Sequence, residues 1–121
     1  MLVLEDLSFH IQRDSHAHGS VCTVWYTYAL HYEGNNAGKP VELWVDLWGD
    51  GLLRNHTLGD SVYDDHRAIL AEKMTHERHF PVPCNILNEE IGMDEIFLRL
   101  HATLSDGREF TWDSAVVRDR F

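Results

Sequence analysis

Apolar and polar residues alternate with a period of two along most of the chain. From Val21 to Tyr32 the even positions are apolar or aromatic, whereas the odd positions include Thr23, Thr27 and His31. The same alternation recurs in residues 41–48, 96–104 and 109–116, and near the N-terminus as Leu7, Phe9 and Ile11. Alternate side chains of a β-strand point to opposite faces, so these five segments are predicted to be strands with one apolar face.

Turn residues separate the predicted strands. Asp106-Gly107 is the strongest hairpin signal, because both residues tolerate the positive φ angles that a type I′ turn requires. The sequence therefore predicts a hairpin that joins the strand ending near Leu104 to the strand starting near Arg108.

The region from 61 to 83 is ambiguous. Residues 64–79 are rich in helix formers, and Ser61-x-x-Asp64 is similar to a helix capping box. Pro81 and Pro83 would confine a strand in this region to the edge of a sheet. We favour an irregular edge strand around residues 74–82, preceded by at most a short helix within residues 61–75.

The segment pattern predicts an all-β fold. About seven strands with one polar face each suit a two-sheet antiparallel sandwich, and a closed barrel is the alternative. The 121 residues are enough for one hydrophobic core, so residues 1–121 are expected to form a single β-sandwich domain.

The layout of three features resembles an immunoglobulin-like β-sandwich. Cys22 lies in the long second strand, Trp44 lies in the next strand, and residues 90–94 form an acidic-x-Gly corner before the strand that contains Ile96. The chain departs from that pattern because no cysteine lies on this later strand and no tyrosine lies in the corner. The resemblance implies a binding role, since this superfold is widespread among binding proteins.

The charge of the chain restricts its partners. Ten basic and 20 acidic residues give a formal charge of −10, which argues against nucleic acid and anionic membranes as ligands. No apolar run approaches the roughly 18 residues of a membrane span, and the first residues lack a basic segment typical of a signal peptide. We therefore expect a cytoplasmic protein, in which Cys22 and Cys84 are reduced thiols; a Cys22–Cys84 disulfide is the alternative.

The chain has nine histidines, some of which are spaced like metal ligands. In an extended loop Asp14, His16 and His18 would point the same way and could bind a divalent metal ion, to which His76 and His79 could add two imidazoles. Solvated loop histidines are the simpler interpretation, so we expect no cofactor apart from this possible metal. No motif for nucleophilic catalysis is present.

Aromatic residues suggest a binding surface. If the face with Val41 and Leu43 is core, then the opposite face of that strand is exposed, and neighbouring strands add aromatic residues to it. The residues predicted to form the interface are Trp25, Glu42, Trp44, Asp46, Trp48 and Phe97. Because aromatic residues are favoured at interface centres, we expect a non-catalytic binding or assembly protein whose partner is another protein or a second copy. A metal-binding protein and a carbohydrate-binding module that uses the tryptophans are the alternatives. Loops of the same chain that partly bury the tryptophans are the simpler explanation of these residues.

Overall fold

The computed structural model of the chain describes residues 2–13, 21–32, 39–50, 55–69, 74–87 and 94–119. These residues form eight β-strands and one 3-10 turn. The elements are β1 (Leu2–Arg13), β2 (Val21–Tyr32), β3 (Pro40–Asp50), β4 (Asn55–Ile69), β5 (Met74–Pro83), η1 (Cys84–Leu87), β6 (Asp94–Leu104), β7 (Glu109–Asp113) and β8 (Val117–Asp119).

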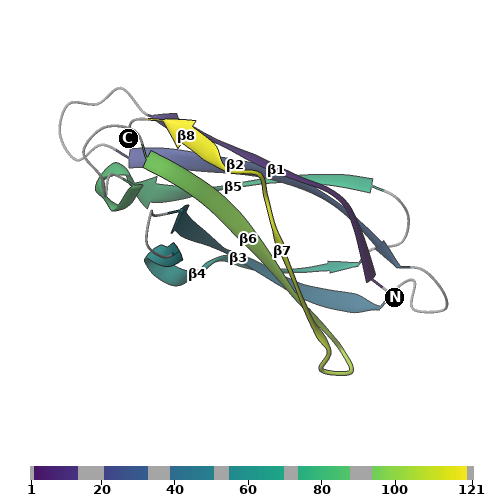
Figure 1. Ribbon diagram of the computed structural model, residues 1–121. Helices are drawn as coiled ribbons and strands as arrows, with labels where there is room; N and C mark the ends of the chain where they lie inside the picture. The colour runs from purple at the N-terminus through teal and green to yellow at the C-terminus, as the bar shows by residue number, and fades with distance from the viewer. Residues whose placement is uncertain are drawn as a thin grey trace.

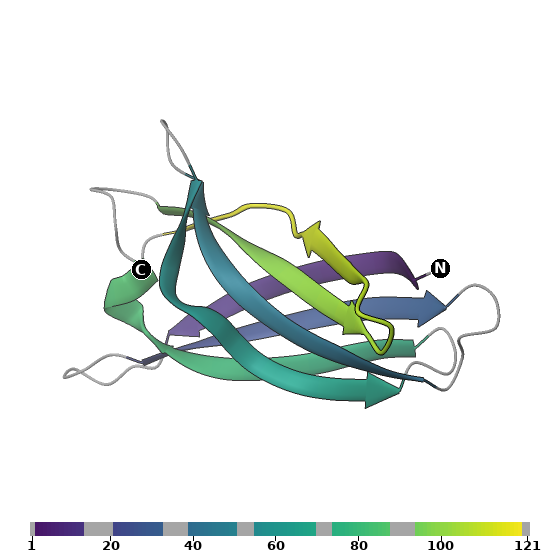
Figure 2. The ribbon, with the colours of Figure 1, turned by 90° about the horizontal axis from the view of Figure 1, so that it is seen from below.

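The strands form two antiparallel sheets that pack face to face (Figure 1). One sheet has the order β1-β2-β5, and the other has the order β4-β3-β6-β7 with β8 also paired to β6. Figure 2 shows the two layers from below, with β3, β4 and β6 in front of the β1-β2-β5 layer. The predicted all-β, two-sheet antiparallel sandwich is confirmed, with one strand more than the seven expected.

The core is made by the apolar faces that the period-two pattern identifies. Every even position from Cys22 to Leu30 is buried on β2, and the odd positions from Val41 to Leu47 are buried on β3. On β6 the even positions from Ile96 to Leu104 are buried in the same way. Fully burying one such side chain stabilises the fold by roughly 1.5–3 kcal/mol, so these three strands supply most of the driving force.

Strand β4 corrects the expectation of a short helix, because residues 61–69 continue a strand. Its pairing with β3 is irregular: Leu47 pairs with Leu58 and Val45 pairs with Tyr63, so the four residues 59–62 of β4 lie opposite one residue of β3, Asp46. Gly59 has a positive φ of 67° within this bulge. The predicted edge strand is confirmed, since β5 covers residues 74–83 and lies at the edge of its sheet.

The two cysteines form a disulfide, which corrects the expectation of reduced thiols. Cys22 of β2 is bonded to Cys84, the first residue of η1, across 62 residues of sequence. Both residues are buried. The bond therefore joins the end of β5 to the neighbouring strand of the same sheet.

The predicted hairpin is present between β6 and β7, but its turn differs from the expected type I′. Gly107 N–H donates to the Leu104 carbonyl, and Leu104 N–H donates to the Arg108 carbonyl, both at 2.9 Å. Of the two turn residues only Gly107 has a positive φ, at 89°. This is the pattern of a three-residue loop, in which one glycine in the left-handed region closes the turn.

None of the described segments forms a helix that is long and apolar enough to span a membrane.

We expect Gly59→Ala to destabilise the protein more than Gly107→Ala does. Both positions have positive φ, which costs a non-glycine residue about 1–2 kcal/mol. A Cβ atom at Gly59 would also lie 2.7 Å from Ile86 Cδ1 and closer still to the Tyr63 hydroxyl, whereas Gly107 faces open space. Urea unfolding of the two variants measures the difference, and equal losses would contradict the packing described at Gly59.

We expect the double variant Cys22→Ala/Cys84→Ala to lose about 2–4 kcal/mol of unfolding free energy, because the bond closes a long loop in the unfolded chain. The measurement is urea unfolding of the oxidised protein and of the variant. If the oxidised wild type and the variant unfold at the same urea concentration, the bond does not contribute to stability.

Candidate functional site

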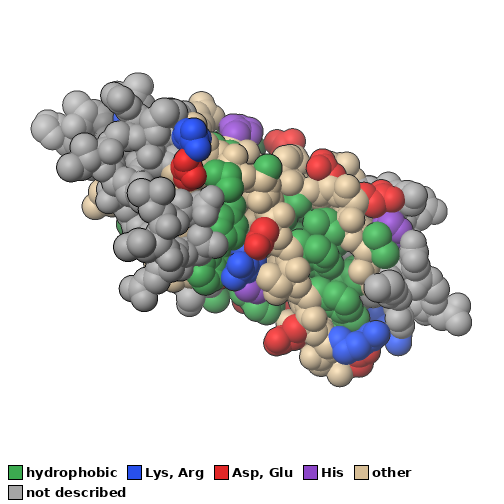
Figure 3. Space-filling model, viewed as in Figure 1, with side chains coloured by type: hydrophobic (Ala, Val, Ile, Leu, Met, Phe, Trp, Pro, Cys, Tyr) green, Lys and Arg blue, Asp and Glu red, His purple; other side chains and the backbone are tan. Residues whose placement is uncertain are grey.

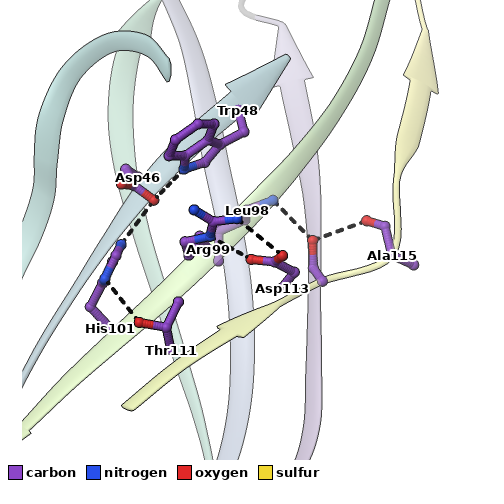
Figure 4. Close-up of polar contacts among 9 residues, drawn as sticks. Asp46, Trp48, Leu98, Arg99, His101, Thr111, Asp113 and Ala115 are labelled. Carbon is purple, nitrogen blue, oxygen red and sulfur yellow. Dashed lines mark hydrogen bonds and ion pairs between the residues drawn. The ribbon is translucent and has the colours of Figure 1, made fainter. Parts of the chain in front are cut away.

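The outer face of the β4-β3-β6-β7 sheet carries a group of stacked aromatic and charged side chains. Pairing between β3 and β6 places Trp44 beside His101, Asp46 beside Arg99, and Trp48 beside Phe97. We call these six residues the aromatic face. Figure 4 shows several of them on the two strands.

Asp46 organises one side of the aromatic face. It is only 6% exposed, and it accepts a hydrogen bond of 2.9 Å from Trp48 Nε1. Its Oδ1 atom also lies 3.1 Å from His101 Nε2 (Figure 4). The His101 ring stacks on Trp44 with centroids 5.1 Å apart and planes 3° apart. The carboxylate thus fixes Trp48 by a hydrogen bond and lies next to the histidine ring on which Trp44 stacks.

Arg99 organises the other side. Its guanidinium lies 4.4 Å from the Trp48 ring centroid and 5.7 Å from that of Phe97, within the range of cation–π attraction. Two hydrogen bonds of 2.7 and 3.3 Å tie the same group to Asp113 of β7. These bonds to Asp113 raise the pKa of Arg99 above its usual value, which is already high, so its positive charge is permanent.

Only part of the predicted interface is available to a partner. Phe97 and Asp46 are buried, so they support the surface from below and a partner cannot touch them. Trp44, Trp48 and Glu42 are half-buried. Sequence analysis missed Arg99 and His101, although their alternation with the buried β6 residues already assigned them to the outer face.

Trp25 does not belong to the aromatic face. The sequence pattern placed it on a strand next to Trp44, but β2 lies in the other sheet, so Trp25 is on the opposite outer surface of the sandwich. There it stacks on His79 with centroids 4.4 Å apart. Its indole Nε1 is buried and has no hydrogen-bond partner within the part of the chain that the structure describes.

The acidic groups around the aromatic face are paired with basic groups. Glu42 accepts a hydrogen bond of 2.7 Å from Arg67, Asp113 is bound by Arg99, and Glu95 pairs with Arg118. Figure 3 shows basic side chains next to acidic ones on the visible surface, with hydrophobic side chains between them. Several carboxylates around the aromatic face are therefore balanced by an arginine, although the chain as a whole carries a charge of −10.

The predicted metal ligands do not come together where the structure describes them. His76 stacks on the buried Tyr28, and His79 stacks on Trp25 at the outer surface, so the two imidazoles lie on opposite faces of β5. Asp14, His16 and His18 lie outside the described residues, as does most of the predicted corner at residues 90–94. The described ranges contain no group of three or more possible ligands that could hold a metal ion.

A second polar group lies between the sheets, where β4 faces β2 and β5. Asp64 accepts a hydrogen bond of 2.5 Å from the Tyr26 hydroxyl and two bonds of 2.6 and 2.8 Å from Arg78. His66 lies 3.0 Å from the Tyr28 hydroxyl through Nε2 and 2.7 Å from the Asp64 carbonyl through Nδ1. We call these five residues the inter-sheet cluster. Two tyrosines on a buried face were the signal for it, because a buried hydroxyl needs a partner.

The inter-sheet cluster has its protonation states set by burial and hydrogen bonding. Burial raises the pKa of both tyrosines, that of Tyr28 to about 12, so both hydroxyls remain donors. Burial alone would raise the pKa of Asp64, but the bonds from Arg78 and Tyr26 hold it below its usual value. Burial lowers the pKa of His66, and nearby Arg78 lowers it further. His66 is therefore neutral, with Nδ1–H donating to the carbonyl and Nε2 accepting from Tyr28.

We expect the unfolding free energy to fall as the pH drops below about 6.5. Burial lowers the folded-state pKa of His66 and of His76, so the unfolded chain binds more protons than the folded one in this range. Their contribution is complete above pH 6.5 and is lost as the pH falls through the folded pKa values. The unfolding free energy is measured by urea unfolding at pH 7, 6 and 5. It should fall less steeply with decreasing pH for His66→Gln than for the control His10→Gln, and an equal fall in both variants would refute the role of His66.

Comparison with known proteins gives no family. No family model and no curated protein matches the chain. Among solved structures, a protein described as ApaA from Bordetella pertussis is 14% identical, with 96% of this chain and 94% of that chain covered and a TM-score of 0.49. Structural-genomics target SoR45 is 10% identical, with 99% of this chain and 86% of that chain covered and a TM-score of 0.42. β-Glucosidase 3B from Thermotoga neapolitana is 13% identical, with 100% of this chain and 17% of that chain covered and a TM-score of 0.36. At these values the similarities say nothing about function.

Proposed function

We propose that this chain is a non-catalytic binding protein that contacts a protein partner through the aromatic face. The supporting observation is that Trp44 and Trp48 are half-buried while hydrogen bonds and stacking already fix their ring orientations. A partner then binds without a large loss of side-chain entropy. Tryptophan and arginine are also the residues that carry most binding energy at interface centres.

The partner that the charge distribution favours is a second copy of the chain. Two molecules with a charge of −10 repel each other at most surfaces. Around the aromatic face the carboxylates of Glu42 and Asp113 are paired with arginines, so this repulsion is reduced there. A two-fold contact would place the same aromatic surface with arginine-paired carboxylates on both partners.

We also propose that the sandwich is immunoglobulin-like. The order β1-β2-β5 opposite β4-β3-β6-β7 supports this, because it corresponds to strands A, B and E opposite C, F and G of that superfold, with β4 beside C. The chain departs from it in two places. Cys22 is bonded to η1 and not to β6, and Trp44 points outward and not toward the disulfide.

The cytoplasmic location stays a prediction. Disulfides such as Cys22–Cys84 persist mainly in oxidising compartments, so the bond favours such a compartment over the reducing cytoplasm.

We expect Trp44→Ser to weaken self-association at least about tenfold, the loss that corresponds to roughly 1.4 kcal/mol at an interface hot spot. Sedimentation velocity over a range of protein concentrations at pH 7.5 measures the dissociation constant. Trp25→Ser is the matched control, since it removes a half-buried tryptophan from the opposite outer surface.

Urea unfolding of both variants establishes that each is folded. A wild type that stays monomeric at all concentrations would exclude the second copy as partner. Equal weakening by Trp25→Ser and Trp44→Ser would show that the aromatic face is not the contact.

A further inference from the structure

The outer surface of the β1-β2-β5 sheet has a regular arrangement of polar and aromatic side chains around Trp25. Strand pairing places His10, Trp25 and His79 side by side in one row, and Ser8, Thr27 and Glu77 in the next row. The first row is stacked: the Trp25 ring lies parallel to His10 within 4° and 4.4 Å from His79. In the second row the hydroxyls of Ser8 and Thr27 are hydrogen-bonded at 2.7 Å.

A shallow cavity opens between these rows. Its volume is about 150 Å³, which is enough for a group the size of a benzene ring. It is lined by Ser8, Phe9, His10, Trp25, Thr27 and Glu77. The Trp25 ring provides an apolar wall, the hydroxyls provide hydrogen-bonding groups, and Glu77 provides the only permanent charge of the lining. Phe9 lines the cavity only from the inside of the strand, because it pairs with Tyr26 and its side chain is buried in the core.

The charge of this surface is negative, and no arginine or lysine balances it among the described residues. The positions that share the face with Trp25 include the acids Asp6 and Glu77, whereas Arg13 pairs with Cys22 and Arg78 pairs with Tyr26, which places both on the inner side. The outer surface of this sheet therefore differs from the aromatic face, where arginines pair with Glu42 and Asp113. A cationic group is the ligand that such a surface attracts.

The indole of Trp25 gives a second indication of a ligand. Its N–H is buried and has no acceptor among the described residues, although buried indole N–H groups normally have one. An ammonium ion cannot act as an acceptor, but a peptide carbonyl can. A lysine or arginine within a polypeptide offers both groups.

We propose that this cavity binds a lysine or arginine side chain presented by a partner polypeptide. The cationic end donates hydrogen bonds to Glu77 and to the hydroxyls of Ser8 and Thr27. The methylene groups of the side chain pack against Trp25, and a neighbouring main-chain carbonyl accepts from the indole N–H. The site is on the opposite surface from the aromatic face, so it does not depend on the function proposed above.

Binding at this cavity is expected to weaken in acid. His10 lines the cavity, and His79 stacks on Trp25 from β5. Histidine is the side chain that gains positive charge between about pH 8 and 5. A positive charge on either of these rings, which lie close to Glu77, would weaken the attraction of the cavity for a cation.

The test is a titration of the ¹⁵N-labelled protein with N-acetyl-lysine amide at pH 7.5, followed by the indole N–H signals of the four tryptophans. Trp25→Phe assigns the signal of Trp25. We expect this signal to shift to saturation while those of Trp44, Trp48 and Trp112 stay in place. Glu77→Gln should weaken binding at least about threefold, as expected for the loss of a charge-assisted hydrogen bond. The control Glu109→Gln removes the same charge from an exposed position on the other sheet and should leave binding unchanged.

Two further titrations complete the test. At pH 5.5 binding to the wild type should be several-fold weaker, and His10→Gln should reduce this difference. n-Butylammonium should bind more weakly than the lysine derivative, because it has no carbonyl. An equal shift with the Nε-acetylated lysine derivative, or no shift of the Trp25 signal, would overturn the proposal. Equal weakening by Glu109→Gln would also overturn the proposal, because the ligand would then be attracted by the overall charge of the protein and not by this cavity.

Discussion

The arrangement of the two sheets depends on a carboxylate, that of Asp64. Strands β4 and β5 lie at neighbouring edges of opposite sheets, and no backbone pairing joins them. Asp64 bridges this gap, because it binds Tyr26 of β2 and Arg78 of β5. A buried carboxylate is costly unless it is paired and hydrogen-bonded, and here both conditions hold. The inter-sheet cluster therefore ties the sheets together at a place where only side chains can do so.

The irregularity of β4 is the structural condition for this tie. Asp64 has a φ of 50°, a conformation that costs a non-glycine residue about 1–2 kcal/mol. It lies between the pairs Leu43–His66 and Val45–Tyr63, where β4 has one residue more than β3. Such bulges re-aim side chains, and this one directs Asp64 toward Tyr26 and Arg78. The strain in the backbone is offset by the three hydrogen bonds that the new direction allows.

The sequence predicted the strands whose apolar and polar residues alternate regularly. It did not predict β4, in which bulges interrupt this alternation. β2, β3 and β6 alternate without interruption, so their buried faces could be assigned residue by residue. β4 could not be recognised, because its bulges shift the pattern from one face to the other and its composition favours a helix. Alternation also separates inner from outer positions without saying which sheet a strand joins. Trp25 and Trp44 were therefore both correctly assigned to outer positions, but they lie on opposite surfaces. His76 and His79 cannot bind the same metal ion, because residues three apart on a strand point to opposite faces of the sheet.

The two outer surfaces each carry a tryptophan stacked on a histidine. They differ in the basic residues that lie near their carboxylates. On both, cross-strand stacking fixes a tryptophan beside a histidine: Trp44 with His101, and Trp25 with His79. On the larger sheet arginines accompany Glu42 and Asp113, and arginine keeps its charge at all physiological pH values, whereas the buried Asp46 lies beside His101. On the smaller sheet histidines take this place, and their charge changes near neutrality. A fall in pH therefore alters the electrostatics of the smaller sheet much more than those of the arginine-paired carboxylates. Because the core between the sheets is closely packed, the two surfaces can respond separately while the sandwich that carries them stays the same.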